Sequence, residues 1–331
     1  MWNSVVPASA RRALERAFAQ CGPLAEDPEP FLASVFSSAG RLPADLIGSL
    51  LQFRAAPAAP GMLLIEGMPV DAELPPTPTA AGKHNPKLTF ISEASILMTA
   101  LLLGEPVGYA DEKNGVLVQN VYPVESEQHS PSNESSDTDL GFHTELSFSR
   151  KQPDRPLHVS SPDFLLLLGL RAARFSDAVT TLADAGDFSR FLSPRALNTL
   201  SRPVFQLRAP YSFTQPNGID RPWSPPVPLF HGAGRTNAVA FDLACGVRAT
   251  APDAEEALEE LRQAVSKPEA HQQIRLRAGD LLVINNRKCA HARSRFHARF
   301  DGTDRWLQRV YVRRSLEGLE SSGTSSFRIL D

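Results

Sequence analysis

The first hundred or so residues lean towards helix, with apolar positions that repeat at helical spacing. Candidate helices cover about 9–20, 29–38, 43–54 and 91–103. One strand-like run, GMLLIEGM at 61–68, follows the third of them. A stretch rich in proline and threonine, ELPPTPTAAGK at 73–83, is expected to cross the surface as a loop.

Beyond Gly115 the pattern changes to apolar runs of ordinary strand length, separated by turn residues. Two predicted helices, at about 187–200 and 253–266, interrupt these runs. The candidate strands are GVLVQNVYPV (115–124), GFHTELSF (141–148), DFLLLLGLR (163–171), AVTTLADA (178–185), VFQLRA (204–209), AVAFDLA (238–244), QQIRLRAGDLLVINN (272–286, two strands about a turn) and RWLQRVYVRR (305–314).

Many strands with few helices between them argue against a doubly wound parallel sheet and favour an antiparallel sandwich. We therefore predict a mainly β fold with flanking helices. Its core would be a double-stranded β-helix (jelly-roll) wrapped by the N-terminal helices. We expect a single domain over 1–331, with a mostly helical wrap at 1–105, the jelly-roll core at 106–315 and a C-terminal tail at 316–331.

Composition narrows the class of protein. A hydrophobic fraction of 42% suffices for a sizeable core in 331 residues, and a formal net charge of −3 gives no general attraction to nucleic acid or to an anionic membrane. The apolar runs are too short to span a bilayer. The three cysteines are widely spaced and form no CxxC pattern, which fits a reducing cytoplasm. We expect a cytoplasmic protein with no nucleic-acid or membrane partner, and the oligomeric state stays open.

The run GFHTELSF raises a question of chemistry. Read as a strand, it points His143 and Glu145 to the same face, because side chains two apart share a face. A histidine bonded to its neighbour would explain the pair alone, but His291 offers a third ligand in NRKCAHARSRF. Two histidines and one carboxylate can occupy one face of an octahedral ion and leave three positions open, as in non-haem Fe(II) oxygenases.

Two arginines follow at positions that suit such a centre. A bidentate 2-oxo acid could fill two open positions and leave the last for O2, and its distal carboxylate would need a cation such as arginine. Arg305 lies 14 residues after His291, and Arg309 shares the face of Arg305 on a predicted strand. Two inward arginines are costly unless anions meet them. The alternative is a solvated basic edge, because this region is crowded with Arg293, Arg295, Arg299, Arg313 and Arg314.

Together, FHTE, NNRKCAHARSRF and ARFDGTDRWLQRVYVRR resemble the clavaminate synthase-like, TauD-related Fe(II)/2-oxoglutarate-dependent oxygenases. The resemblance is to the branch that includes free-standing hydroxylases and desaturases of arginine, asparagine and related amino acids. It spans about 60–315, its most specific part is the C-terminal run, and EKNGVLVQNVYPV and PPTPT add to it.

The resemblance implies a role for each matching residue. His143, Glu145 and His291 match the iron ligands. Arg305 matches the arginine that pairs with the distal carboxylate of 2-oxoglutarate. Thr181 matches the hydroxyl that binds the same carboxylate, although Thr180 is adjacent.

Other matches concern an amino-acid substrate. Arg309 matches an arginine that faces the α-carboxylate, and Gln119 a residue that holds the α-amino group with help from Glu145. Asp242 stands where relatives place acids that read the substrate's side chain, or it bonds to local backbone. Arginine-specific relatives tend to show a second acid two residues later, where this chain has Ala244. An amide or amine end of the substrate therefore stays open.

The segment ESEQHSPSNESSDTDL at 125–140 is polar, rich in serine and acid, and leads directly to His143. It is either a disordered surface loop or an active-site lid. In the second interpretation Ser130, Asn133 and Asp137 are lid residues. The link at 151–167 is also longer than usual for the family and could reshape the pocket mouth.

The expected function follows from the resemblance. The protein would use Fe(II), 2-oxoglutarate and O2 to hydroxylate an unactivated C–H bond of an L-amino acid or amino-acid-derived metabolite, in natural-product biosynthesis. A desaturase of the same substrates and a catalytically inactive jelly-roll binding protein are the alternatives. A cupin-like zinc or manganese isomerase or hydrolase would share the ligands without needing Arg305.

Overall fold

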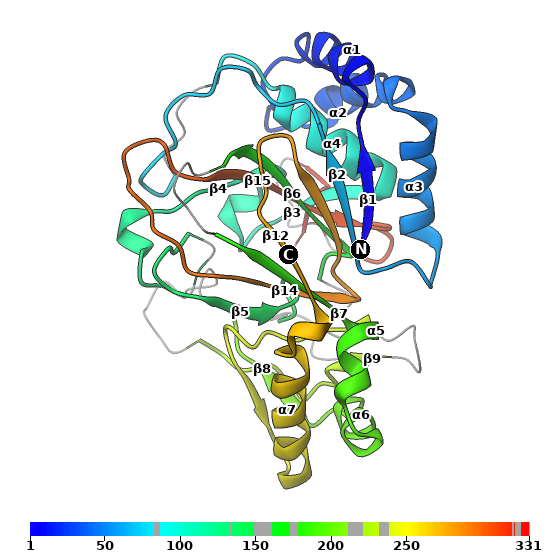
Figure 1. Ribbon diagram of the computed structural model, residues 1–331, viewed down its shortest axis with the longest axis vertical. Coiled ribbons are helices and arrows are strands. Elements are labelled where there is room, and N and C mark those ends of the chain that lie inside the picture. Colours follow the sequence, from blue (N-terminus) through cyan, green and yellow to red (C-terminus); the bar gives the residue numbers. More distant parts are fainter. Residues whose placement is uncertain are drawn as a thin grey trace.

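A computed structural model describes residues 1–82, 87–130, 132, 134–148, 161–172, 178–210, 221–231, 238–319, 321 and 326–330. In this part of the chain, two β-sheets lie between groups of helices (Figure 1). The predicted class, mainly β with flanking helices, is confirmed. Within the described residues, no helix is both long enough and apolar enough to cross a membrane.

The larger sheet has 8 strands in the order β1-β2-β13-β6-β15-β3-β16, and β4 pairs with β15 on the same edge as β3, opposite β6. Its pairs are antiparallel except β1 with β2 and β16 with β3. The strands are β1 (Trp2–Val5), β2 (Met62–Glu66), β3 (Glu105–Tyr109), β4 (Gln119–Val121), β6 (Phe164–Arg171), β13 (Leu281–Asn285), β15 (Trp306–Arg313) and β16 (Ile329–Leu330).

The smaller sheet has 4 antiparallel strands in the order β12-β7-β14-β5. They are β12 (His271–Ile274), β7 (Thr180–Asp184), β14 (Cys289–Arg293) and β5 (Leu140–His143). Two short ribbons complete the strands: β8 (Phe205–Leu207) with β11 (Val247–Ala249), and β9 (Phe230–His231) with β10 (Ala238–Val239).

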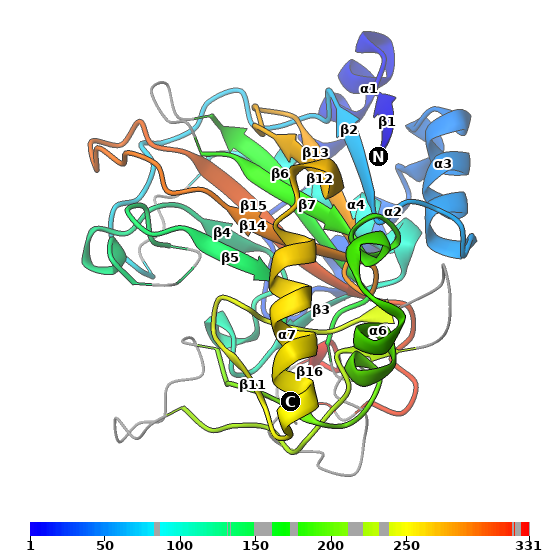
Figure 2. The ribbon, with the colours of Figure 1, turned by 60° about the horizontal axis from the view of Figure 1, so that its bottom comes forward.

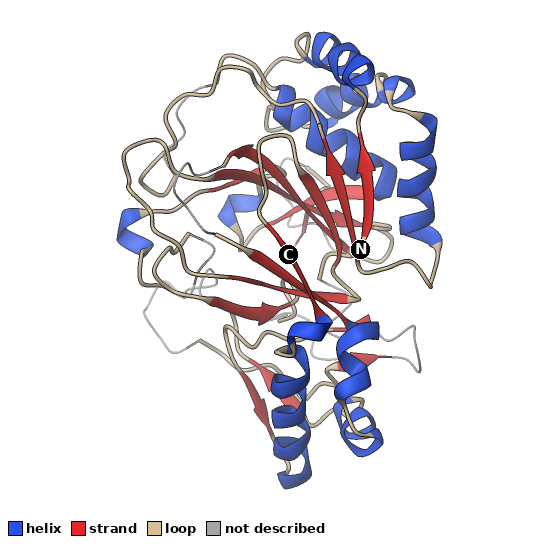
Figure 3. Ribbon diagram, viewed as in Figure 1, coloured by secondary structure: helices blue, strands red, loops and turns tan. Residues whose placement is uncertain are grey.

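Helices cover the outer faces of both sheets, as the blue ribbons of Figure 3 show. The N-terminal group is α1 (Ala8–Phe18), α2 (Glu29–Phe36), α3 (Ala44–Ala55) and α4 (Ile91–Leu103), close to the predicted ranges. The second group is α5 (Ala185–Phe188), α6 (Pro194–Leu200) and α7 (Pro252–Val265), and α6 and α7 pack side by side (Figure 2). The helix expected at about 187–200 is therefore divided into the end of α5, a 3-10 helix at Ser189–Phe191 and α6, because Ser193 and Pro194 begin a new helix.

Three clusters of buried apolar side chains lie between the layers of helices and sheets. One lies between the N-terminal helices and the outer face of the larger sheet. The second occupies part of the space between the two sheets, with residues such as Leu282 and Leu182 from opposite sides. The third joins α5, α6 and α7 to the outer face of the smaller sheet. Because β6 is buried on both faces, its sequence is a continuous apolar run rather than an alternation.

One strand prediction needs correction. The run 141–148 was expected to be one strand, but β5 ends at His143 and Leu146 has a left-handed φ of 49°. The two strands expected within 272–286 are both present, but they lie in different sheets. β12 belongs to the smaller sheet and β13 to the larger, so the turn around Gly279 (φ 83°) carries the chain from one sheet to the other.

Candidate active site

The candidate metal centre lies on the smaller sheet, on the face that looks towards the larger one. His143 is the last residue of β5, and His291 is at the middle of β14, directly opposite His143 in the strand register. Their ring centroids are 4.2 Å apart. The pairing of two antiparallel strands therefore brings together two residues that are far apart in the sequence.

Glu145 reaches the same point from the turn after β5 rather than from a continued strand. Its backbone N–H donates to the Asn286 Oδ1 at 2.7 Å, and the Asn286 Nδ2 donates to the Glu145 carbonyl at 3.0 Å. Asn286 also donates to the Pro162 carbonyl at 3.0 Å. The buried side-chain amide of Asn286 therefore holds the turn that carries the Glu145 carboxylate.

The three side chains form a donor set for one divalent ion. One ligand atom from each of His143, Glu145 and His291 lies within 4.8 Å of the others. The His143 Nδ1 contacts the Gly141 carbonyl at 2.9 Å, which favours a proton on Nδ1 and leaves Nε2 free to bind a metal. Two imidazoles and a carboxylate, with open positions towards a cavity, fit Fe(II).

The charge states of His291 and Glu145 suit metal binding. Burial, with His143 beside it, lowers the pKa of His291, so its imidazole is neutral at pH 7. Burial alone would raise the pKa of Glu145, but Arg309, His291 and His143 outweigh burial and hold that pKa below its ordinary value. The site thus offers a neutral imidazole at His291 and an ionised oxygen at Glu145, the forms that bind a metal.

The larger sheet supplies the opposite wall through alternate residues of β15. The Tyr311 hydroxyl donates to the Glu145 Oε2 at 3.0 Å, and burial keeps this phenol protonated by raising its pKa well above the usual value. The Arg309 Nη1 lies 3.4 Å from the Glu145 Oε1. Burial alone would lower the pKa of Arg309, but the carboxylates of Glu145 and Glu112 help to outweigh burial and raise it.

Gln119, on β4, lies directly across from Arg309 in the strand register. Its Oε1 accepts hydrogen bonds from the Arg309 Nε at 2.9 Å and from Nη2. A guanidinium only donates, so this orientation of the amide is fixed. The Gln119 Nε2 is then left as a buried donor without a partner in the described structure. As oriented, Gln119 presents a donor, which suits a carboxylate and not an ammonium group.

Arg305, just before β15, lines the same cavity as Arg309. It has no ion pair with a described residue, and burial with Arg293 beside it lowers its pKa to about 9, so it stays charged at pH 7. Thr180 also lines the cavity and lies opposite Arg293 in the strand register. Thr181, the predicted residue, lies opposite Ala292 on the other face of β7. The structure thus brings Thr180 to the cavity instead.

Asp242 lines the cavity beside His143, with which it forms an isolated bridge between strands. Its Oδ1 accepts hydrogen bonds from the backbone N–H groups of Ala244, at 2.9 Å, and Cys245, at 2.7 Å. The local backbone bonding predicted for Asp242 is therefore present, and the substrate-binding role stays a prediction. One oxygen caps a local turn, and the second has no hydrogen bond within the described residues.

The predicted lid residues differ in their positions. Ser130 lines the cavity, and its hydroxyl donates to the Glu127 carbonyl at 2.9 Å. Asp137 is exposed and accepts a hydrogen bond from the Gln128 Nε2 at 2.8 Å, so it faces away from the cavity. Asn133 lies outside the described residues.

The sequence-based reasoning missed several residues of the site. Glu112, Asn286 and Tyr311 are buried and bond to predicted site residues. The sequence could have indicated Tyr311, because it lies two residues after Arg309 and therefore shares its face of the strand. The partners of Glu112 and Asn286 are far away in the sequence and carried no local signal.

The cavity has a volume of about 1120 Å³ and is bounded by both sheets and by the segment 127–134. The metal ligands, Arg305 and Arg309 all line it. This volume lies at or above the upper end of the usual range for small-molecule sites, so two small ligands could occupy it together.

Comparison with known proteins gives a consistent result. Residues 90–311 match the family described as taurine catabolism dioxygenase TauD, TfdA family. L-asparagine oxygenase of Streptomyces coelicolor is 36% identical over 272 residues, which are 82% of this chain and 76% of that protein. Clavaminate synthase 2 of Streptomyces clavuligerus is 31% identical over 301 residues, 90% of this chain and 87% of that protein.

Solved structures agree with the sequence relatives. An asparagine oxygenase in complex with Fe(II), 2S,3S-3-hydroxyasparagine and succinate has a TM-score of 0.86 and 29% identity, covering 100% of this chain and 99% of that one. The non-heme iron oxygenase OrfP in complex with Fe and alpha-ketoglutaric acid has a TM-score of 0.81 and 25% identity, covering 99% and 100%. The resemblance seen in the sequence motifs is confirmed, and the chain belongs to the TauD/TfdA family of dioxygenases.

Proposed function

We propose that this protein is an Fe(II)/2-oxoglutarate-dependent oxygenase that hydroxylates an unactivated C–H bond of an L-amino acid or amino-acid-derived metabolite. The observation that carries the proposal is the convergence of His143, Glu145 and His291 with two inward arginines on one cavity. The relatives named above include enzymes whose names and complexes specify amino-acid chemistry. We also propose that the two sheets form a double-stranded β-helix core within a single domain.

His143, Glu145 and His291 would hold Fe(II). When bound, the iron would supply the activation of O2 together with 2-oxoglutarate. The chain's own part is to keep Glu145 ionised and both imidazoles available, and to exclude water from the reacting carbon. Tyr311 supports this by donating to the Glu145 oxygen that does not face Arg309.

Arg305 and Thr180 would bind the distal carboxylate of 2-oxoglutarate. Arg305 is a charged guanidinium without a carboxylate partner among the described residues, and such a group in a largely buried place needs an anion. Thr180 adds a hydroxyl from the neighbouring sheet. The role predicted for Thr181 passes to Thr180, because Thr181 lies on the other face of β7.

Arg309 and Gln119 would bind the α-carboxylate of the amino acid, since both have donors left at the cavity. The α-ammonium group would then lie beside the carboxylate of Glu145. The unbonded oxygen of Asp242 would accept from the far end of the substrate. A single acid, with Ala244 nearby, favours an amide or amine end over a guanidinium that two acids would hold.

The test is a panel of L-amino acids with Fe(II), 2-oxoglutarate and ascorbate, in which asparagine, glutamine, lysine, ornithine and arginine are included. Mass spectrometry should find a gain of one oxygen in one of them, with matching succinate. Loss of two hydrogens would identify a desaturase, and binding without succinate an inactive relative. Activity without O2 would contradict the proposal. The cytoplasmic location and the absence of nucleic-acid or membrane partners stay predictions.

A further inference from the structure

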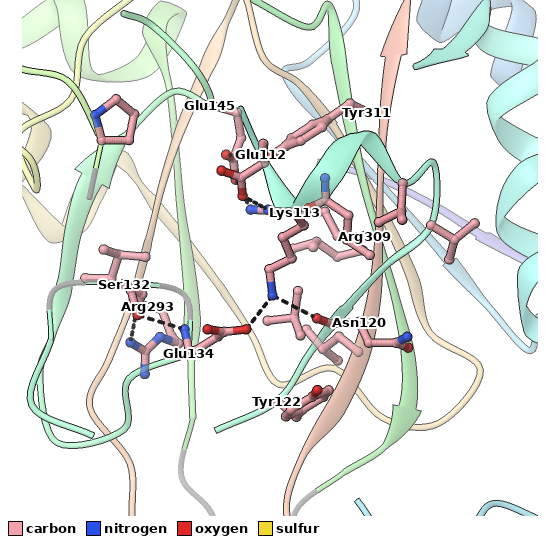
Figure 4. A pocket seen from close by; sticks show the side chains of 18 of the residues that line it. Glu112, Lys113, Asn120, Tyr122, Ser132, Glu134, Glu145, Arg293, Arg309 and Tyr311 are labelled. Atoms are coloured by element: carbon pink, nitrogen blue, oxygen red, sulfur yellow. Dashed lines mark hydrogen bonds and ion pairs between the residues drawn. The ribbon is translucent and has the colours of Figure 1, made fainter. Parts of the chain in front are cut away.

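A tight turn at Glu112–Gly115 stands between the substrate site and the loop 125–140. Three successive residues have left-handed φ angles, Lys113 at 47°, Asn114 at 59° and Gly115 at 74°. Left-handed conformations are unfavourable for residues other than glycine, so contacts elsewhere must hold Lys113 and Asn114 there. The turn sends two neighbouring side chains to different places (Figure 4).

The first of these side chains reaches the substrate site. Glu112 is buried, and its Oε1 accepts a hydrogen bond from the Arg309 Nη2 at 2.6 Å. Gln119 occupies the Nε of the same guanidinium. With those donors taken, Nη1 is left at the cavity, 3.4 Å from the Glu145 Oε1. Glu112 thus fixes the plane of Arg309 and decides which donor faces a substrate.

The second side chain reaches the loop. The Lys113 Nζ forms an ion pair with Glu134 and donates to the Asn120 carbonyl at 3.2 Å (Figure 4). The pair is shielded, with 25% of the Lys113 side chain and 17% of the Glu134 side chain exposed. Asn120 follows Gln119 on β4. Lys113 therefore ties the loop to the strand that carries a contact of Arg309.

The loop is held on its other side by Arg293. The Arg293 Nη2 donates to the Ser135 Oγ at 2.6 Å and to the Ser132 and Thr138 carbonyls at 3.3 Å. Ser132 and Glu134 both line the cavity. The loop is thus held by contacts with Arg293 on β14 and with Lys113. We expect that loss of either contact would loosen it.

We propose that Glu112 and Lys113 are positioning residues that act as one unit. Through the rigid left-handed turn, the Lys113–Glu134 ion pair holds the loop over the cavity while Glu112 holds Arg309 ready for the substrate's carboxylate. The proposal rests on the proposed function, because it assigns an amino-acid substrate to Arg309. It predicts that the loop's stability and substrate recognition change together.

The first experiment needs no turnover. Hydrogen–deuterium exchange of the protein reads the amides of Val124, Ser136 and Asp137, which donate to carbonyls of the loop. Lys113→Met keeps an unbranched side chain in the left-handed turn but removes the charge. It should speed exchange roughly threefold to tenfold, and Glu134→Gln should do the same. The double variant should be no faster than either single one.

Matched variants control for general damage. Lys113→Arg retains a cation and should keep most of the protection. Lys267→Met removes an exposed lysine that follows α7, outside the loop, and should change nothing. Unaltered loop exchange in Lys113→Met, or equal loosening in Lys267→Met, would overturn the tie.

The second experiment uses whichever panel amino acid the wild-type enzyme oxidises. Glu112→Gln should raise the KM for that amino acid roughly tenfold and leave the KM for 2-oxoglutarate within about twofold. Lys113→Met should also raise the amino-acid KM and increase succinate formed without hydroxylated product. An unchanged amino-acid KM in Glu112→Gln would overturn the role of Glu112. If the wild type oxidises no panel member, the proposed function fails, and the exchange data still decide the loop tie.

Discussion

Each residue of the metal centre meets a different local constraint. His291 is fixed by a strand that has neighbours on both sides, and His143 by its pairing with β14 and by the Gly141 carbonyl. Glu145 depends on a turn. The sequence was sufficient to find all three, because ligand type and the motif around His291 are local features. It did not reveal that Glu145 leaves the strand.

The first prediction concerns the histidines. His143→Ala and His291→Ala should abolish substrate-coupled succinate formation, because two ligands cannot hold Fe(II) in the required geometry. Circular dichroism should stay like the wild type, since the surrounding strands keep their pairing. His297→Ala, at an exposed position, serves as the control. Succinate formation at the wild-type rate in either ligand variant would refute the assignment.

The second prediction separates the two arginines. Arg305→Ala should raise the apparent KM for 2-oxoglutarate roughly tenfold to a hundredfold, because a charge-assisted bidentate contact is lost. Arg309→Ala should act mainly on the amino substrate. Thr180→Val should raise the KM for 2-oxoglutarate more than Thr181→Val does. The reverse order for the threonines would restore the sequence-based assignment, and exchanged effects would mean that the arginine roles are swapped.

Some residue-scale assignments depend on which face of a strand a side chain takes. A shift of one residue along a strand turns a side chain to the other side, so Thr180 and Thr181 could not be distinguished without the strand register. The different role that we propose for Gln119 rests on a related feature. Its amide orientation is imposed by Arg309 across the sheet, which no local pattern records.

At the scale of elements, polar side chains at strand ends hold the site in shape. Asn286 follows β13 and bonds to both backbone groups of Glu145. Asp163 precedes β6 and pairs with Arg287 at 3.0 Å and with Arg313 at 3.6 Å. These contacts connect strands that are neighbours in space, and only the fold could identify them.

The third prediction tests the support of the turn. Asn286→Ala should weaken Fe(II) binding roughly tenfold to a hundredfold, because the backbone that presents Glu145 loses its anchor. The free energy of unfolding should fall by about 2 kcal/mol, since buried donors and acceptors are left unpaired. Equilibrium dialysis of the metal and urea unfolding measure the two effects. Asn198→Ala, on the exposed side of α6, is the matched control, and wild-type metal affinity in Asn286→Ala would contradict the prediction.

The fourth prediction concerns pH and the pair at Asp163. Burial alone would raise the pKa of Asp163, but Arg287 and Arg313 outweigh burial and lower it below 3.8. A lowered pKa stabilises the folded state above the ordinary value, and this stabilisation is lost as the pH falls through the folded value. Asp163→Asn should therefore cost about 3 kcal/mol at pH 7. In urea unfolding, the difference from the wild type should shrink below pH 3.8; a constant difference down to pH 2 would contradict this cause.

Across the whole molecule, the site exists because two sheets face each other. The smaller sheet brings the two histidines, and β15 of the larger sheet brings Arg309 and Tyr311. The β-rich class with its helical wrap could be predicted from strand-length runs and few helices. The assignment of β12 and β13 to different sheets could not, because an apolar run with a glycine turn also fits a hairpin.

The fifth prediction follows from a site shared between sheets. Ligands that bind only the folded state stabilise it by mass action, about 2.7 kcal/mol at about 100 times Kd. Under anaerobic conditions, Fe(II) with 2-oxoglutarate should therefore raise the Tm by roughly 3–8 °C. In Arg305→Ala the shift from Fe(II) alone should persist while the part added by 2-oxoglutarate falls. In His291→Ala both should vanish, because the 2-oxo acid binds through the metal, and a full shift in that variant would mean that the ligands stabilise the fold from another place.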